Sequence, residues 1–186
     1  MGTLFVDKLD PQSGTSLEIG SSGDTITIPS GCTITNNGTQ TGFGGVMTPA
    51  FSAYGGTQSG VANNTTTVLT CNSEVFDSDS KYDTSTYRFT PGVTGKYFFY
   101  VAFKNNQSDT RLQCGIYKNG SLISEADGRM EPENNGHGSN TYTGVQGSVI
   151  SICDNTSDYF QAFGWQKSGS TLTFYNARFM GYKIIE

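Results

Sequence analysis

The segment from residue 82 to residue 103 constrains the fold of this chain more than any other. In its first half, apolar Tyr87 and Phe89 alternate with polar neighbours, which is the pattern of a strand with one buried face. Residues 91–95 are rich in Pro and Gly and predict a turn. After this turn, residues 97–103 are apolar on both parities. Both faces of such a strand must be buried, one against the core of its own domain and the other against a second cover, which is another part of the chain or another protein.

The composition predicts an all-β protein. With 186 residues, the chain is long enough to bury one good core. Its 24 Gly, 12 Phe and 10 Tyr favour strands that are joined by tight turns. No stretch of helical periodicity is longer than about two turns, which is shorter than a stable helix usually needs.

Charge and cysteine usage narrow the possible partners. The net charge of −5 is spread out, and the 11 Lys and Arg form no basic stripe, which argues against nucleic acid. The start of the chain does not resemble a signal peptide and no apolar run approaches a membrane span, so we expect synthesis in a cytoplasm and no membrane insertion. We expect free, buried thiols, without disulfides or a zinc site, at Cys32, Cys71, Cys114 and Cys153.

The chain divides into a leader, residues 1–47, and a head, residues 48–186. The leader has three short alternating segments, at 17–19, 26–28 and 32–34, separated by turns rich in Gly, Ser and Asn. Because it is poor in aromatic residues, we expect a β-rich stalk or docking segment that packs against identical segments or another protein. A disordered polar leader is the alternative, against which the spaced Ile residues argue.

The head contains longer and more aromatic strands. Nine strands with short turns fit the size of one sandwich. The pair Asn119-Gly120 between two alternating runs predicts a hairpin. The predicted strands cover residues 50–54, 66–71, 87–90, 96–104, 112–118, 122–126, 141–153, 159–167 and 171–185. The last of them is again apolar on both parities, which indicates association with another chain.

No pattern in the chain supports catalysis, and we expect no enzyme activity and no cofactor. The single histidine, His137, lies in a polar loop without a nucleophile beside it. Acidic pairs that would serve a glycosidase lie in loops and are expected to be solvated. Asp77, Asp79 and Asp83 offer oxygen ligands for a structural calcium ion, but they lack the Gly and Glu of a calcium loop, which favours a structural turn.

Aromatic side chains near loops are candidates for contact with a receptor. Tyr142, Tyr159 and Trp165 are able to stack on a sugar ring, although such residues in a sandwich more often belong to the core or to an interface. We keep Tyr142, Trp165 and the loop residue His137 as candidates for receptor or glycan contact.

An ordered set of short motifs runs through the head. They are Pro49-Ala50-Phe51-Ser52-Ala53, Tyr82-Asp83 through Phe89-Thr90-Pro91, Gly95-Lys96-Tyr97-Phe98-Phe99, Tyr117-Lys118-Asn119-Gly120, Gly147-Ser148-Val149-Ile150, Ser157-Asp158-Tyr159-Phe160 and Phe179-Met180-Gly181-Tyr182-Lys183-Ile184. In order and spacing they resemble the C1q/tumour-necrosis-factor-like head. Ser157 stands where that family usually has Gly, and the chain has no collagen-like repeat. The leader resembles the β-rich lead-in segments of bacteriophage virion and tail-fibre proteins.

The resemblance implies a jelly roll of about ten strands that forms a homotrimer, with aromatic strand faces around a three-fold axis. This arrangement would supply the second cover for residues 97–103. The pattern alone does not decide which parity faces the neighbouring subunit. We expect Tyr97, Phe99 and Val101 there, together with Phe179 and Tyr182.

These inferences predict a non-enzymatic virion protein of a bacteriophage. It would be a short fibre or knob on the tail or the capsid, with residues 1–47 contacting other virion proteins and the head contacting a host-surface glycan or protein. The alternatives are a glycan-binding or glycan-cleaving protein of the tail-spike type and a secreted C1q-like ligand module.

Overall fold

The computed structural model describes residues 8–38, 47–107, 110–123, 129–130 and 143–184. The chain divides into two compact units, Met1–Phe43 and Gly44–Glu186. This division lies within a few residues of the boundary that the sequence predicts.

In the first unit, the described residues form turns but no strand. Ser21 N donates to the Asp24 carboxylate at 2.7 Å, and Asp24 N donates to Ser21 O at 3.0 Å, which closes one of the predicted turns. Aliphatic side chains between the turns are exposed, among them Ile19, Ile26, Ile28 and Ile34. Residues 8–38 of one copy thus contain no strand, and a short strand without a neighbour to pair with is not stable on its own.

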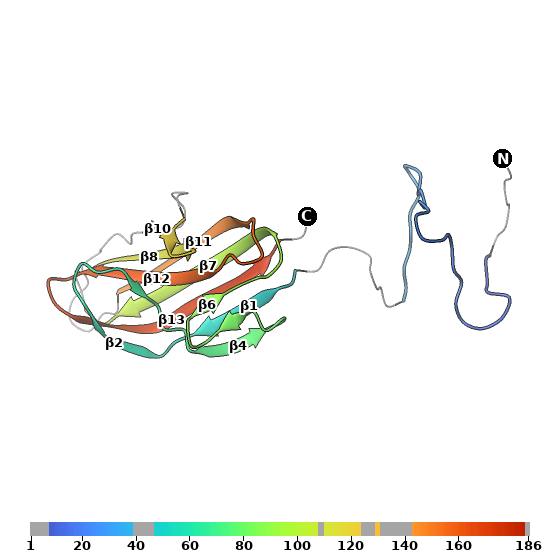
Figure 1. Ribbon diagram of the computed structural model, residues 1–186. Coiled ribbons are helices and arrows are strands. Elements are labelled where there is room, and N and C mark those ends of the chain that lie inside the picture. Colours follow the sequence, from blue (N-terminus) through green and yellow to red (C-terminus); the bar gives the residue numbers. More distant parts are fainter. Residues whose placement is uncertain (1–7, 39–46, 108–109, 124–128, 131–142, 185–186) are drawn as a thin grey trace. The chain divides into compact units, whose positions relative to one another are not determined.

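The second unit is a sandwich of two antiparallel sheets (Figure 1). Its strands are β1 (Ala50–Tyr54), β2 (Thr57–Val61), β3 (Thr67–Val68), β4 (Ser73–Asp77), β5 (Tyr82–Asp83), β6 (Arg88–Phe89), β7 (Gly95–Asn105), β8 (Arg111–Lys118), β9 (Ser121–Leu122), β10 (Arg129–Met130), β11 (Thr143–Cys153), β12 (Phe160–Lys167) and β13 (Leu172–Lys183). No helix occurs in the part of the chain that the structure describes.

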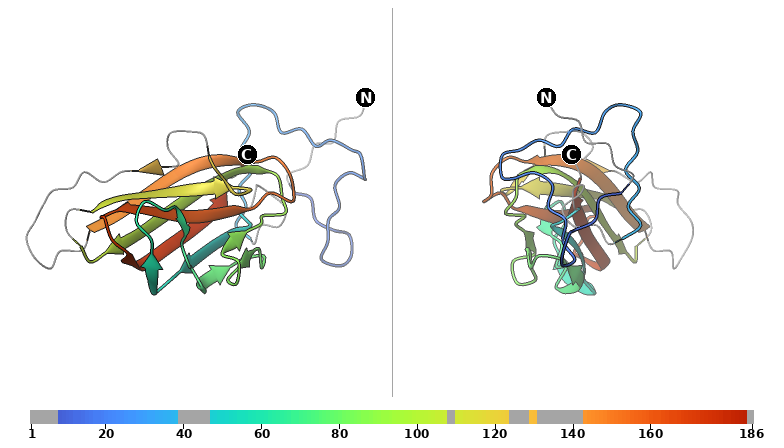
Figure 2. Two further views of the ribbon diagram at one scale, coloured as in Figure 1. Left: turned by 60° about the vertical axis from the view of Figure 1, so that its left-hand side comes forward. Right: turned by 90° about the vertical axis from the view of Figure 1, so that its right-hand side faces the viewer.

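The two sheets, here called sheet A and sheet B, stack as two layers (Figure 2). Sheet A has the strand order β11-β7-β13-β1-β4, and β2 also pairs with β13. Sheet B has the order β10-β8-β12-β6-β5, with β3 on β12 and β9 on β8. The predicted Asn119-Gly120 hairpin joins β8 to β9, and both turn residues have positive φ, 52° and 80°.

Aromatic rings from both sheets fill the space between the layers. The Phe51 ring on β1 stacks on the Phe89 ring of β6, with the centroids 4.3 Å apart. The Phe99 ring on β7 packs against the Phe160 ring of β12 at 4.4 Å. Each of these side chains is at most 1% exposed. Since full burial of such a side chain contributes about 1.5–3 kcal/mol, these contacts hold sheet A against sheet B.

Candidate functional site

Side chains on the central strand β7 alternate between the core of the sandwich and the outer face of sheet A. Tyr97, Phe99 and Val101 point into the sandwich, and each is at most 1% exposed. Phe98 and Tyr100 point to the outer face of sheet A and are half-buried. The structure corrects the expectation that Tyr97, Phe99 and Val101 face a neighbouring subunit, because aromatic rings of sheet B already cover that parity.

The two interface candidates on β13 lie on opposite faces of the strand. Phe179 is in the core at 1% exposure, whereas Tyr182 is 38% exposed on the outer face. A bulge at Asn176, where φ is 53°, shifts the register of β13 against β7. Phe174 before the bulge and Phe179 after it therefore both point inward. The structure corrects the placement of Phe179 at an interface and leaves Tyr182 available to a partner.

The outer face of sheet A carries a surface that we call the apolar band, made of Phe98, Tyr100, Ile150, Ile152, Met180 and Tyr182. Phe98 pairs with Ile150 on β11 and with Tyr182 on β13, so the three side chains form one row across the sheet. The rings of Phe98 and Tyr182 lie 5.3 Å apart. Ile150 and Ile152 are 58% and 56% exposed. A contiguous exposed apolar surface of this kind marks an interaction site.

Polar and charged groups border the apolar band. The Tyr100 hydroxyl donates to Gln146 Oε1 at 2.8 Å. Lys96 and Lys104 stand at the two ends of the parity that carries Phe98 and Tyr100. An aromatic and aliphatic centre with a polar rim is the composition of protein–protein interfaces. These lysines are the sequence signal for the outward parity, because the other parity of the strand carries no charge.

A cluster of Lys118 with the buried Asp158 and the exposed Asp154, here called the polar corner, fixes the turn after β11. Lys118 Nζ donates to Asp154 Oδ1 at 2.6 Å and to Ile152 O at 2.9 Å, and it lies 3.0 Å from Asp158 Oδ2. Burial alone would raise the pKa of the Asp158 carboxyl, but hydrogen bonds from Asn119 and Lys118 hold that pKa well below its usual range. The polar corner therefore stabilises the turn beside the apolar band.

The candidates for receptor contact are only partly within the described residues. Trp165 is half-buried on β12, and the Arg111 guanidinium lies 5.9 Å from the centroid of its indole ring. His137 and Tyr142 lie outside the described residues.

The acidic residues considered as calcium ligands take part in their own turns. Asp77 Oδ2 accepts a hydrogen bond from Tyr82 N at 2.7 Å, and Asp83 Oδ1 accepts one from Ser85 N at 2.8 Å. Within the described ranges, no three His, Cys, Asp or Glu side chains are grouped so that they could hold a metal ion. The same ranges contain no helix with the length and hydrophobicity needed to cross a membrane.

Comparison with known proteins shows the fold. No protein-family model and no curated protein sequence matches the chain. Among solved structures, the globular domain of zebrafish complement 1qA protein matches with a TM-score of 0.50 and 18% identity, over 73% of this chain and 96% of that chain. The PRD1 vertex protein P5 matches with a TM-score of 0.56 and 15% identity, over 75% of this chain and 99% of that chain. The head is therefore a C1q/TNF-like jelly-roll sandwich, as the sequence predicts.

Proposed function

We propose that this chain is a non-enzymatic structural protein of a bacteriophage virion and that its head associates as a homotrimer. The observation that carries the proposal is the apolar band. Its two isoleucines are more than half exposed on a single chain, and the aromatic side chains beside them are only partly covered. Association of copies would bury this surface and supply the second cover that β7 needs.

A second apolar surface on sheet A supports a ring. On the edge strand β4, Val75 is 68% exposed and Phe76 is 52% exposed. β4 and β11 lie at opposite edges of sheet A. A contact between two different surfaces of the same chain is heterologous, and it closes into a ring when the rotation between copies fits. The C1q/TNF-like fold of the head favours a ring of three.

Two observations support a place in a virion. The fold resembles that of the PRD1 vertex protein P5 over nearly the whole length of that protein. The leader carries exposed aliphatic side chains at short intervals, among them Leu17, Ile19 and Ile26. Such side chains would be buried against other virion proteins or against further copies of the leader. The head, as a short fibre or knob on the tail or the capsid, would then present three copies of its outward surface to the host.

Light scattering coupled to size-exclusion chromatography tests the homotrimer. We expect the full chain to have three times the mass of one chain at micromolar concentration. Phe98→Asp places a charge in the apolar band and should yield monomers whose far-UV circular dichroism is unchanged. Val93→Asp is the matched control, because Val93 is 45% exposed and lies outside the band. A stable monomer of the parent chain would overturn the proposed assembly.

The virion location needs its own experiment. Antibodies against the head should label intact particles of the phage that encodes the chain, and the chain should be detected in purified particles by mass spectrometry. Absence from particles that are otherwise complete would refute a structural role in the virion, whatever the oligomeric state.

A further inference from the structure

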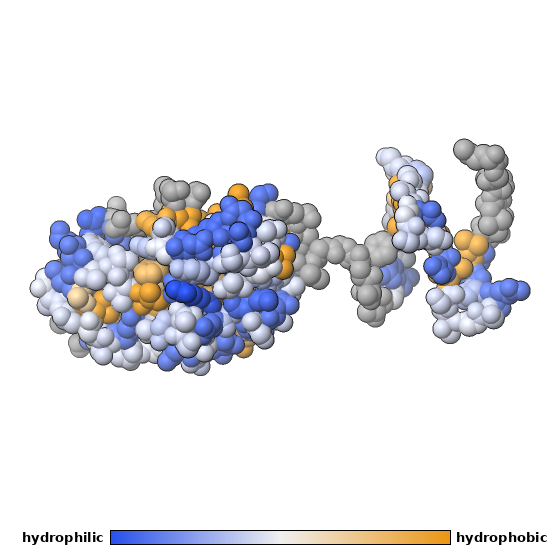
Figure 3. Space-filling model, viewed as in Figure 1, coloured by the Kyte–Doolittle hydropathy of each residue, from blue (hydrophilic) through white to orange (hydrophobic). Residues whose placement is uncertain are grey.

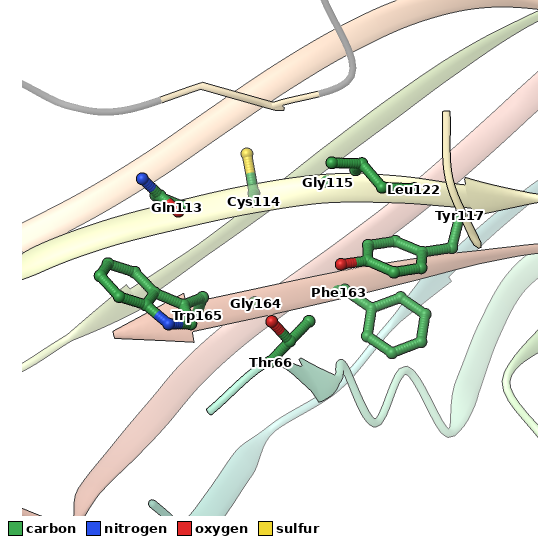
Figure 4. Close-up of a pocket in the computed structure, with 9 residues that line it drawn as sticks. All are labelled: Thr66, Gln113, Cys114, Gly115, Tyr117, Leu122, Phe163, Gly164 and Trp165. Atoms are coloured by element: carbon green, nitrogen blue, oxygen red, sulfur yellow. The ribbon is translucent and has the colours of Figure 1, made fainter. Parts of the chain in front are cut away.

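The outer face of sheet B carries an aromatic groove that the apolar band does not include. Its lining includes Thr66, Gln113, Gly115, Tyr117, Phe163 and Trp165, and its volume is about 90 Å³. In Figure 4, Trp165 lies at one end of the groove, and Tyr117 and Phe163 lie at the other. On the face drawn in Figure 3, hydrophobic surface occurs as small separate patches among hydrophilic surface.

The strand pairing of β8 with β12 explains the hollow. Gln113, Gly115 and Tyr117 share one parity of β8, and Gly115 pairs with Phe163 across the ladder. Since Gly115 has no side chain, the space between Gln113 and Tyr117 stays open. The Phe163 ring instead packs on the Tyr117 ring, with the centroids 3.9 Å apart. The aromatic rings are thus held by their neighbours before any ligand arrives.

The chemistry of the lining selects one class of ligand. None of the described residues that line the groove is an acidic or basic residue, and the Arg111 guanidinium near Trp165 is not among them. The lining itself therefore offers no charged hydrogen-bond partner for a phosphate or a carboxylate. It offers aromatic faces together with two neutral polar groups, namely the Thr66 hydroxyl and the Tyr117 hydroxyl. A pyranose ring has the matching surface, because one side is lined by C–H groups and its rim carries hydroxyls.

We propose that this groove binds a neutral pyranose unit of a glycan. The volume is well below the roughly 300 Å³ at which pockets for drug-sized ligands begin, so one face of a single sugar ring is the fitting occupant. A contact of that size binds in the millimolar range. The inference deepens the proposed function, on which it depends for avidity, since three linked sites on one trimer raise the effective affinity. The site itself belongs to a single chain.

The experiment uses the only tryptophan of the chain as its reporter. The sequence contains one Trp, so the emission of Trp165 reports on the groove without a label. The full chain is titrated with the methyl glycosides of glucose, galactose, mannose, rhamnose and N-acetylglucosamine. We expect a saturable change in emission with at least one sugar, at millimolar concentration. No saturable change with any sugar would overturn the proposal, as would stronger binding of N-acetyltyrosinamide, which would indicate a peptide ligand.

Variants separate the groove from the rest of the surface. Tyr117→Ala should weaken the sugar response at least tenfold, while Tyr159→Ala should leave it unchanged, because Tyr159 stacks on Arg88 outside the groove. If Tyr117→Ala does not fold, Thr66→Arg fills the hollow from an exposed position and should have the same effect. An unchanged response in the folded variant would contradict the proposal. Phe98→Asp should keep the monosaccharide affinity even as a monomer, which distinguishes failure of the groove from failure of the trimer.

Discussion

The adjacent residues Phe98 and Phe99 on β7 have different roles, one in association and one in the core. A substitution at each residue distinguishes the two roles. Phe99 is fully buried between the sheets, so Phe99→Ala removes a core ring and leaves a cavity. We expect the free energy of unfolding to fall by about 3–5 kcal/mol in urea titrations. Phe98→Ala is the control, because Phe98 lies on the outer face; it should keep the sandwich core intact and weaken association. Equal loss of core stability in the two variants would contradict the parity assigned here.

Gly181 is required by the packing of Phe99. A Cβ atom at Gly181 would lie 2.5 Å from Phe99 Cδ1 and 2.8 Å from Phe98 O, and the backbone atom cannot give way cheaply. Gly181→Ala should therefore destabilise the head by about 1–3 kcal/mol, as overpacking does, with the loss measured by thermal unfolding. At Gly56 nothing lies within 4 Å of the added carbon. Gly56→Ala should melt close to the parent, and a similar loss at both glycines would argue against a steric cause.

At the scale of strands, the long elements and the short strands β1, β3 and β6 fall within or close to predicted ranges, whereas other short strands do not. The predicted ranges 96–104, 112–118 and 159–167 lie within or nearly match β7, β8 and β12, because their apolar runs end at Gly, Asn or Ser turns. β2 and β4 were not predicted. β2 is mostly polar and exposed, and β4 is an edge strand whose exposed Val75 and Phe76 give no buried face to detect. Alternation reports burial, so an edge strand without a buried parity leaves no signal.

The candidate surface was harder to predict than the fold. Both parities of residues 97–103 are apolar, so periodicity could not show which side chains face the core. The sequence indicates the outward parity only through Lys96 and Lys104, which lie on the same side of the strand as Phe98 and Tyr100. In β13, one parity appeared to continue through residues 172–184, whereas the bulge at Asn176 exchanges the faces. A one-residue shift of this kind moves every later side chain to the other face and cannot be seen in an alternation count.

The polar corner makes the stability of the folded head depend on pH, through the turn between β11 and β12. Because the Asp158 pKa is lowered in the folded chain, its contribution is fully present above the unfolded pKa of about 3.9 and is lost as the pH falls below that value. Asp158→Asn should cost about 1.5–3 kcal/mol at pH 7 and flatten the acid limb of stability against pH. Asp154 is the exposed partner of the same lysine, with a side chain that is 72% accessible. Asp154→Asn should therefore lower the free energy of unfolding by at most about 1 kcal/mol. Chemical denaturation between pH 2 and 7 measures both, and a larger effect at Asp154 would contradict this assignment.

For the whole molecule, the two units differ in whether a single chain buries their apolar side chains. The head closes its own core, with aromatic rings from both sheets below 2% exposure. The described part of the leader has turns at the predicted positions, but its aliphatic side chains remain in solvent. A pattern of short alternating segments specifies turns locally, whereas strand pairing needs a neighbouring strand, and residues 8–38 of one copy supply none.

This difference predicts the outcome of separating the units. Residues 44–186 produced alone should keep the melting temperature, the circular dichroism and the oligomeric state of the full chain, because the core and the apolar band both lie in that unit. Residues 1–43 produced alone should lack strand signal at low concentration, since their exposed isoleucines have nothing to pack against. If the leader forms its strands with other copies, joining it to an unrelated trimeric protein should bring three leaders together and produce a β-type spectrum. A coil spectrum in that fusion would show that three leaders held at high effective concentration do not pair with one another, and it would contradict strand formation between copies.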